Sequence, residues 1–251
     1  MIHVAKDVSS ANIGLSDLEL ENIVKCIKMF VSKFETQYAK LNKYKISYKN
    51  LKEIYDDIVK NIANRFRDAI SYAIKITANF LKSKELKVKP KLAFTKLLGD
   101  LYCKKFNLLG SSDSLENAQK NYESCLALVN DSGIEESDPV LLTFYLNYSN
   151  FLAGKMSKKE EAIKISKMAL ERVTSKGIEL KEKSQTDILF LCQLIKDNLA
   201  LWKSEVILTN NKMILPGQFV SKARGNNPDD KRNLLNNNIE FVANLVHNKP
   251  K

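Results

Sequence analysis

The chain of 251 residues is 44% hydrophobic, which is enough apolar material for a packed core and excludes global disorder. No apolar run reaches the roughly 18 to 20 residues that span a bilayer, and the first residues lack the apolar centre of a signal peptide, so we expect a cytoplasmic protein. The formal charge of +11 favours acidic partners such as phosphorylated segments, acidic peptides, nucleic acid or an anionic membrane face, although scattered lysines can also serve only to solvate helix surfaces.

The residues that most often carry out catalysis or bind metals are sparse. The two histidines, His3 and His247, lie at opposite ends of the chain, which leaves the interior without the commonest general base. The cysteines are isolated, with no CxxC or other metal-ligand spacing, and the chain contains no glycine-rich phosphate loop, HExxH or GxSxG motif. We therefore expect a protein that is not an enzyme and that holds no cofactor and no metal.

Turn residues and apolar periodicity predict an all-α protein. The prolines leave residues 1–89 and 140–215 uninterrupted, and glycines recur between 110 and 177 at intervals that suit one helix and a turn. Strand-like alternation is nowhere sustained. Short turns make consecutive helices antiparallel neighbours in a bundle. In chain order we expect helices at about 16–43, 45–61, 63–82, 91–108, 113–131, 138–154, 158–175 and 184–206.

Three short sequences are typical of helix starts. Ser16 with Glu19, and Ser157 with Glu160, fit the capping box, in which a hydroxyl and a carboxylate satisfy backbone N–H groups of the first turn. Asp138 followed by proline combines a cap residue with a ring whose missing N–H costs nothing at that position. We expect a helix to begin at each of these places.

The composition changes after Trp202. Residues 209–233 are rich in asparagine, glycine, proline and charge, which is typical of a linker. A last amphipathic stretch, between residues 234 and 246, predicts a short helix. We therefore divide the chain into a helical bundle over residues 1–206 and a basic C-terminal tail over residues 207–251.

Two asparagines in apolar helical surroundings are candidates for binding a peptide backbone. Asn198 has Leu194, Leu201 and Trp202 at helical steps of three and four, and Asn147 lies in a similar apolar run. An amide side chain both donates and accepts hydrogen bonds, which suits an extended backbone. An asparagine satisfied within the bundle fits the same spacing.

Four motifs occur in the order that a known family shows: SYKN at 47–50, GDLY at 99–102, LNYS at 146–149 and DNLALWKSE at 197–205. They resemble motifs of the third, fifth, seventh and last helices of 14-3-3 proteins. The spacing agrees from residue 91 to 205, and DNLALW is the most specific of the four.

The resemblance implies an antiparallel bundle of eight to nine helices with a concave groove. In this family the groove binds phosphoserine or phosphothreonine segments, with cations on the phosphate, amides on the ligand backbone and apolar side chains beside it. It further implies a cytoplasmic signalling adaptor that works as a homodimer or heterodimer. Carried over by position, the peptide-binding residues are Lys49, Leu146, Asn147, Leu194, Asn198, Leu201 and Trp202, with Lys104 as a further cation. The leucines fit ordinary bundle core equally well.

The departures from the family fall on the phosphate-binding residues. Where the fifth helix of the family has an Arg-Tyr pair, this chain has Cys103 and Lys104, and Asp56 stands at the position of the third-helix arginine. An alternative register recovers a lysine and an arginine as Lys60 and Arg67. Because a phosphate dianion prefers bidentate guanidinium groups, we expect a weakened phosphate grip. The stretch between SYKN and GDLY is also shorter than in the family, which predicts an altered dimer interface.

Three alternatives remain open. The run Leu98 to Tyr102 fits a tetratricopeptide repeat, although the pattern does not recur at the repeat's interval. The positive charge fits a nucleic-acid-binding protein, although the chain has one tryptophan, no dense basic run and no recognised nucleic-acid motif. A scaffold that keeps the fold and binds unphosphorylated partners fits the altered phosphate-binding positions.

Overall fold

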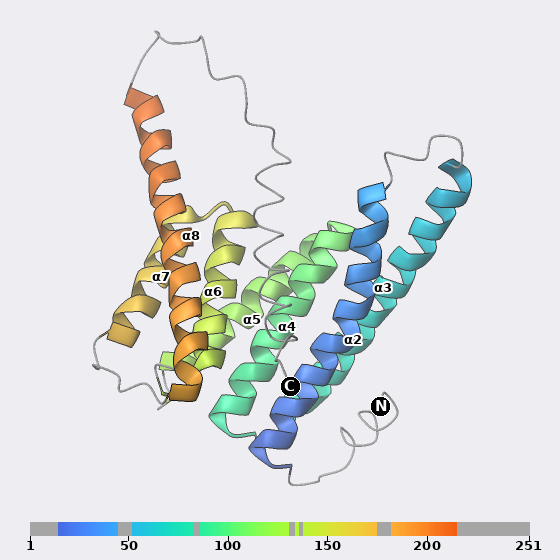
Figure 1. Cartoon of the computed structure of the whole chain (residues 1–251), viewed down its shortest axis with the longest axis horizontal. Helices are drawn as coiled ribbons and strands as arrows, with labels where there is room; N and C mark the ends of the chain where they lie inside the picture. Colours follow the sequence, from blue (N-terminus) through green and yellow to red (C-terminus); the bar gives the residue numbers. More distant parts are fainter. Residues whose placement is uncertain are drawn as a thin grey trace. The chain divides into compact units, whose positions relative to one another are not determined.

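The computed structural model describes residues 15–44, 52–82, 86–130, 134–135, 138–174 and 182–214. All secondary structure in these residues is α-helical, as predicted (Figure 1). The chain divides into two compact units, residues 1–208 and 209–251, and the first holds the helices described below except for the last residues of the final helix. The helix predicted to end at 206 continues to Ile214, so the first residues of the predicted linker are helical. The predicted domain boundary after residue 206 stays a prediction, and the predicted helix of the tail lies outside the described residues. Among the described helices, none has the length and apolar character that crossing a membrane requires.

The described residues contain seven helices. The first three are α2 (Asp17–Tyr44), α3 (Lys52–Leu81) and α4 (Val88–Leu109). The remaining four are α5 (Ser112–Asn130), α6 (Pro139–Gly154), α7 (Lys159–Thr174) and α8 (Glu182–Ile214). Most of these bounds lie within a few residues of the predicted ones.

The predicted helix break near residue 62 is wrong. Helix α3 runs without interruption for 30 residues, where we expected separate helices at 45–61 and 63–82. Its sequence contains neither glycine nor proline, so no residue within it favours a helix end. The second half of α3 places Phe66, Ile70, Ala73 and Phe80 on one buried face, which packing against α2 and α4 stabilises.

A helix begins within two residues of each of the three predicted starts, and two of the three predicted caps form. The Glu19 carboxylate accepts from the Ser16 backbone N–H at 2.8 Å and its hydroxyl at 2.6 Å, while the Glu19 N–H donates to the Ser16 hydroxyl at 3.3 Å. The Asp138 carboxylate accepts from the Val140 N–H at 2.8 Å. The capping box predicted at Ser157 does not form, because Ser157 has a φ of 56° and α7 begins only at Lys159.

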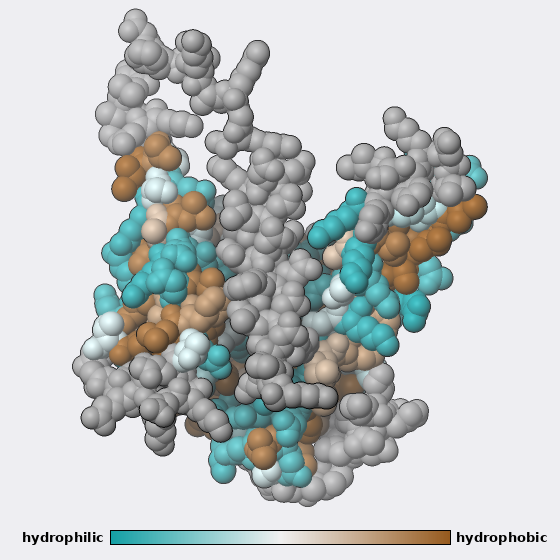
Figure 2. All heavy atoms as spheres, in the orientation of Figure 1, coloured by the Kyte–Doolittle hydropathy of each residue, from teal (hydrophilic) through white to brown (hydrophobic). Residues whose placement is uncertain are grey.

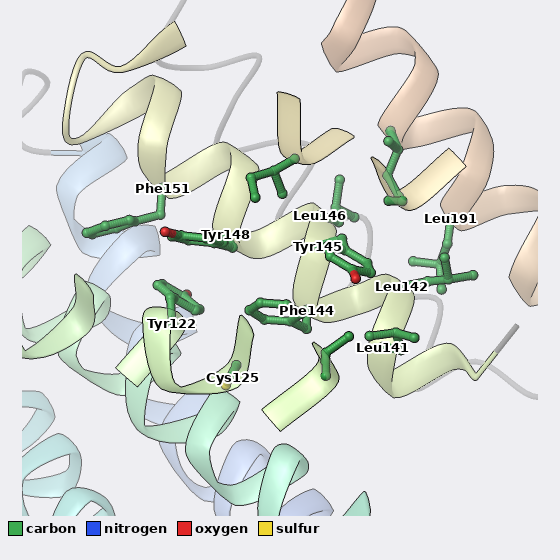
Figure 3. Packing of buried hydrophobic residues seen from close by; sticks show 14 of the residues in the cluster. Tyr122, Cys125, Leu141, Leu142, Phe144, Tyr145, Leu146, Tyr148, Phe151 and Leu191 are labelled. Atoms are coloured by element: carbon green, nitrogen blue, oxygen red, sulfur yellow. The ribbon is translucent and has the colours of Figure 1, made fainter. Parts of the chain in front are cut away.

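Helix α4 lies between two apolar clusters and is buried along most of its first half. One cluster joins α4 to α2 and α3, and it includes the stacked rings of Phe80 and Phe94, 5.1 Å apart. The other joins α5, α6, α7 and α8 with Leu92 of α4. In it the ring of Tyr122 lies 5.5 Å from that of Tyr148 (Figure 3).

Helices α4 and α5 approach closely at Gly99. A Cβ atom at this position would lie 2.9 Å from Cε1 of Tyr122, a separation that side-chain atoms do not tolerate. Tyr122 is itself buried, so its ring has little room to move. The glycine of the GDLY motif therefore allows the contact that brings the Tyr122 hydroxyl to the next residue, Asp100.

Candidate binding site

Asp100 of α4 is the centre of a hydrogen-bonded group drawn from three helices. Its carboxylate accepts from Lys96 Nζ at 2.7 Å, from the Tyr122 hydroxyl of α5 at 2.7 Å and from Asn147 Nδ2 of α6 at 2.9 Å. The Lys96 side chain is only 4% exposed. Burial alone would raise the pKa of Asp100, but the Lys96 and Lys28 ammonium groups hold it below its usual value. Asp100 therefore stays ionised and ties α4 to α5 and α6.

Lys28 of α2 contributes a second ammonium group near Asp100. Its side chain is exposed, in contrast to that of Lys96. The Lys96 ammonium is the main reason that the pKa of Lys28 falls to about 8, and the limited hydration between α2 and α4 adds to the fall, while Asp100 opposes it. The close placement of two cations marks a positive region at the α2–α4 junction.

Two turns further along α2, Glu35 forms an ion pair with Lys104 of α4. The Lys104 Nζ lies 2.6 Å from Oε1 and 2.5 Å from Oε2 of Glu35. The two side chains are 26% and 37% exposed. Below, Lys28, Glu35, Lys96, Asp100 and Lys104 are called the charged cluster.

Cys103 supplies no reactive thiolate to this region. Its Sγ lies 3.9 Å from the Tyr122 hydroxyl. Burial raises the pKa of the thiol to about 12, and the Asp100 carboxylate contributes to the rise. The thiol therefore stays protonated at neutral pH and acts as a small apolar group.

Hydrogen bonds made by asparagines connect α4 to α6 and α6 to α8. Asn147 donates to Asp100, and Asn198 Nδ2 of α8 donates to the side-chain carbonyl of Asn150 on α6 at 3.0 Å. Asn147 and Asn150 lie three residues apart, on the same side of α6. All three amides are half-buried. Together with the Leu194 and Leu201 side chains on either side of Asn198, they are called the amide strip below.

The structure separates the apolar residues predicted to contact a ligand. Leu146 and Trp202 are 4% and 3% exposed and lie in the core of the second cluster. Leu194 is half-buried, whereas Leu201 is 48% exposed. Leu201 is thus the member of this set with the most surface available to a partner.

The predicted cation Lys49 lies outside the described residues, so its role stays a prediction. Asp56, Lys60 and Arg67, the residues of the two registers considered for the phosphate grip, are exposed on α3. The charged cluster takes its side chains from α2 and α4 instead. On α2, Lys28 and Glu35 are seven residues apart, the same step at which the family resemblance places a lysine and an arginine. At the second of these positions this chain has a carboxylate.

Sequence reasoning missed Lys28, Glu35, Lys96 and Asn150. A local signal existed for Lys96, because it and Asp100 are the charged residues of an otherwise apolar run over 92–101, four residues apart on a helix. For Lys28 and Glu35 the signal was the predicted helix start at Ser16, which places a lysine and a glutamate two turns apart on one helix face.

Comparison with known proteins yields one family. A family model described as "14-3-3 protein" matches residues 1–203. A 14-3-3 protein beta/alpha-1 from Oncorhynchus mykiss is 26% identical over 150 residues, which cover 58% of this chain and 61% of the relative. The 14-3-3-like protein 1 of Caenorhabditis elegans is 28% identical over 148 residues, covering 58% of this chain and 59% of the relative. The chain thus spans about three fifths of the length of the curated relatives that it matches.

Proposed function

The chain belongs to the 14-3-3 family, and on this premise we propose that it is a non-enzymatic adaptor that binds an anionic segment of a partner protein. The segment would carry a phosphoserine, a phosphothreonine or an acidic side chain. It would lie along the charged cluster and the amide strip. The protein would act in the cytoplasm and without a cofactor.

The observation that carries this proposal is the row of side chains that leads from cations to amides. Asn147 touches the charged cluster through Asp100, and Asn150, one turn further on α6, touches Asn198 of α8. A segment whose anionic group lies at Lys28 can therefore form hydrogen bonds between its backbone and these asparagines. This is the chemistry that an extended peptide needs, because its own N–H and C=O groups otherwise remain unsatisfied.

Asn198 has hydrogen-bonding capacity left for a ligand. An asparagine amide can take part in about four hydrogen bonds, and Asn198 makes one such side-chain bond among the described residues, to Asn150. Its carbonyl oxygen and its other N–H are therefore available to accept from and donate to a peptide.

Exposed apolar side chains on α8 would add contact area beside the asparagines. Leu201 is 48% exposed and Leu208 is 61% exposed. They follow Leu194 at steps of seven residues, so all three lie on one face of the helix with Asn198. Figure 2 shows hydrophobic surface in this part of the molecule, towards the end of α8. A ligand would gain affinity by covering it.

We further infer that the protein works as a homodimer or heterodimer whose interface differs from that of its relatives. The resemblance implies a dimer, and the shortened stretch before GDLY implies a changed contact surface. Sedimentation of the full-length chain at several concentrations would measure this, and a monomer at all of them would contradict it.

The proposal is tested with a phosphoserine peptide library and the unphosphorylated twin of each member. We expect anionic members to bind the full-length protein at micromolar or lower concentrations and Asn198→Ala to weaken this by about tenfold, the effect of one lost hydrogen bond to a half-buried amide. Asn64→Ala, an exposed asparagine of α3, is the matched control and should leave affinity unchanged. Absence of binding, or binding that Asn198→Ala leaves intact, would overturn the proposal.

A further inference from the structure

We propose that the charged cluster selects the carboxylate of an aspartate or glutamate side chain over a phosphate group, with the Lys28 ammonium as the donor. The inference rests on the proposed function and names the kind of segment that the site takes.

Ion pairing within the charged cluster leaves one cation, Lys28, available to a ligand. Lys96 is bonded to Asp100 at 2.7 Å, and Lys104 to both oxygens of Glu35 at 2.6 and 2.5 Å. Among the described residues, Lys28 forms no ion pair, although Lys96 and Asp100 lie close to it. Three ammonium groups and two carboxylates therefore leave a net charge of one, and that charge is on an exposed side chain.

Within the part of the chain that the structure describes, the guanidinium groups, which bind phosphate well, all have partners away from the charged cluster. Arg65 of α3 lies over the ring of Phe34, 5.6 Å from its centroid, and Arg67 pairs with Asp68 at 3.2 Å. Arg172 of α7 donates to an asparagine of α5. The cluster therefore offers single ammonium groups, and none of the bidentate donors that match the oxygens of a phosphate.

The charge of the ligand decides between the two anions. A phosphoserine carries about −1.5 to −2 at neutral pH, and a glutamate carries one negative charge. Attraction to the site grows in proportion to the ligand's charge, but the loss of hydration grows with the square of that charge, so a weakly positive site favours the monoanion. Lys104 could help to balance a dianion only by leaving Glu35, which would then repel the ligand.

Three degenerate peptide libraries test the inference, identical except for a central glutamate, phosphoserine or serine. Their affinities for the full-length chain are measured by fluorescence anisotropy. We expect the glutamate library to bind about tenfold tighter than the serine library and no weaker than the phosphoserine library. Lys28→Gln should remove most of that tenfold, while Lys33→Gln, the same change at an exposed lysine of α2, should remove little of it.

Glu35→Gln supplies a gain of function. It frees Lys104 and removes the repelling carboxylate, so affinity for phosphoserine should rise about tenfold and exceed that for glutamate. Thermal unfolding of each variant confirms that it is folded.

Two results overturn the inference and leave the proposed function standing: phosphoserine bound about tenfold tighter than glutamate by the wild-type chain, or a glutamate preference that survives Lys28→Gln. If none of the libraries binds, the proposed function falls together with the inference.

Discussion

The charged cluster and the amide strip differ in how far their own contacts already satisfy them. In the cluster, Lys96 and Lys104 both have carboxylate partners, so the α2–α4 side of the site presents a small net charge. In the strip, Asn198 keeps unused hydrogen-bonding capacity and Leu201 is 48% exposed. The strip can therefore hold many extended segments, whereas the balance of charge in the cluster determines which anion a segment must carry.

The largest effect should come from the apolar end of the site, where neighbouring residues of α8 have opposite roles. Trp202 is 3% exposed in the second cluster, so Trp202→Ala should lower the free energy of unfolding by about 4 kcal/mol through the cavity it leaves. Leu201→Ala should change it by less than about 0.5 kcal/mol and weaken ligand binding instead. Urea denaturation measures the first quantity and peptide titration the second. Equal losses of stability would show that the division between core and binding surface is wrong.

The next largest effect should come from Asp100, the carboxylate of the charged cluster to which Lys96 is bonded. Asp100→Ala leaves the 4% exposed Lys96 without its carboxylate, and we expect a loss of about 3 kcal/mol in the free energy of unfolding. Lys96→Met in the same chain should recover much of this loss, because it removes the stranded charge. Glu161→Gln, at the exposed pair with Lys158, is the control and should cost about 0.5 kcal/mol or less. An Asp100→Ala variant as stable as the wild type would contradict the buried network.

The smallest effect is a pH dependence that belongs to the cluster and not to the strip. Lys28, which faces Lys96 and Asp100 of α4 and has Lys25 beside it on α2, has a pKa lowered to about 8. Because the protonated ammonium binds the anion, affinity for a glutamate peptide should fall about tenfold as the pH rises from 7 to 9. Lys28→Arg keeps its charge over this range and should abolish the dependence. A wild-type affinity that is constant with pH would remove Lys28 from the binding site.

Much of the fold could be predicted from the sequence, because helix ends depend on the residue types at the ends themselves. Gly110 ends α4 with a φ of 68°, and Asp138 caps α6, so both boundaries fall where residue types predict them. The break expected within α3 had no such residue behind it and is absent. In the site, the sequence pointed to Asn147 and Asn198 through motifs of their own helices.

The hydrogen-bond partners of Asn147 and Asn198 could not be predicted from the sequence, because these partners lie far away along the chain. Asn147 reaches Asp100 and Asn198 reaches Asn150, across sequence separations of 47 and 48 residues. Lys28 is one exposed lysine among the 40 lysines and arginines of the chain, and only the packing of α2 on α4 distinguishes it. Periodicity predicts the face of a helix, but it does not predict which helix that face meets.

The most direct test of the central claim, that one anionic segment lies across the charged cluster and the amide strip, is a crystal structure of the full-length chain with its tightest glutamate peptide. We predict the glutamate carboxylate at about 2.7–3.2 Å from Lys28 Nζ, the peptide backbone bonded to Asn198, and the Glu35–Lys104 pair intact. A peptide bound elsewhere, or a carboxylate that displaces Glu35 from Lys104, would contradict it.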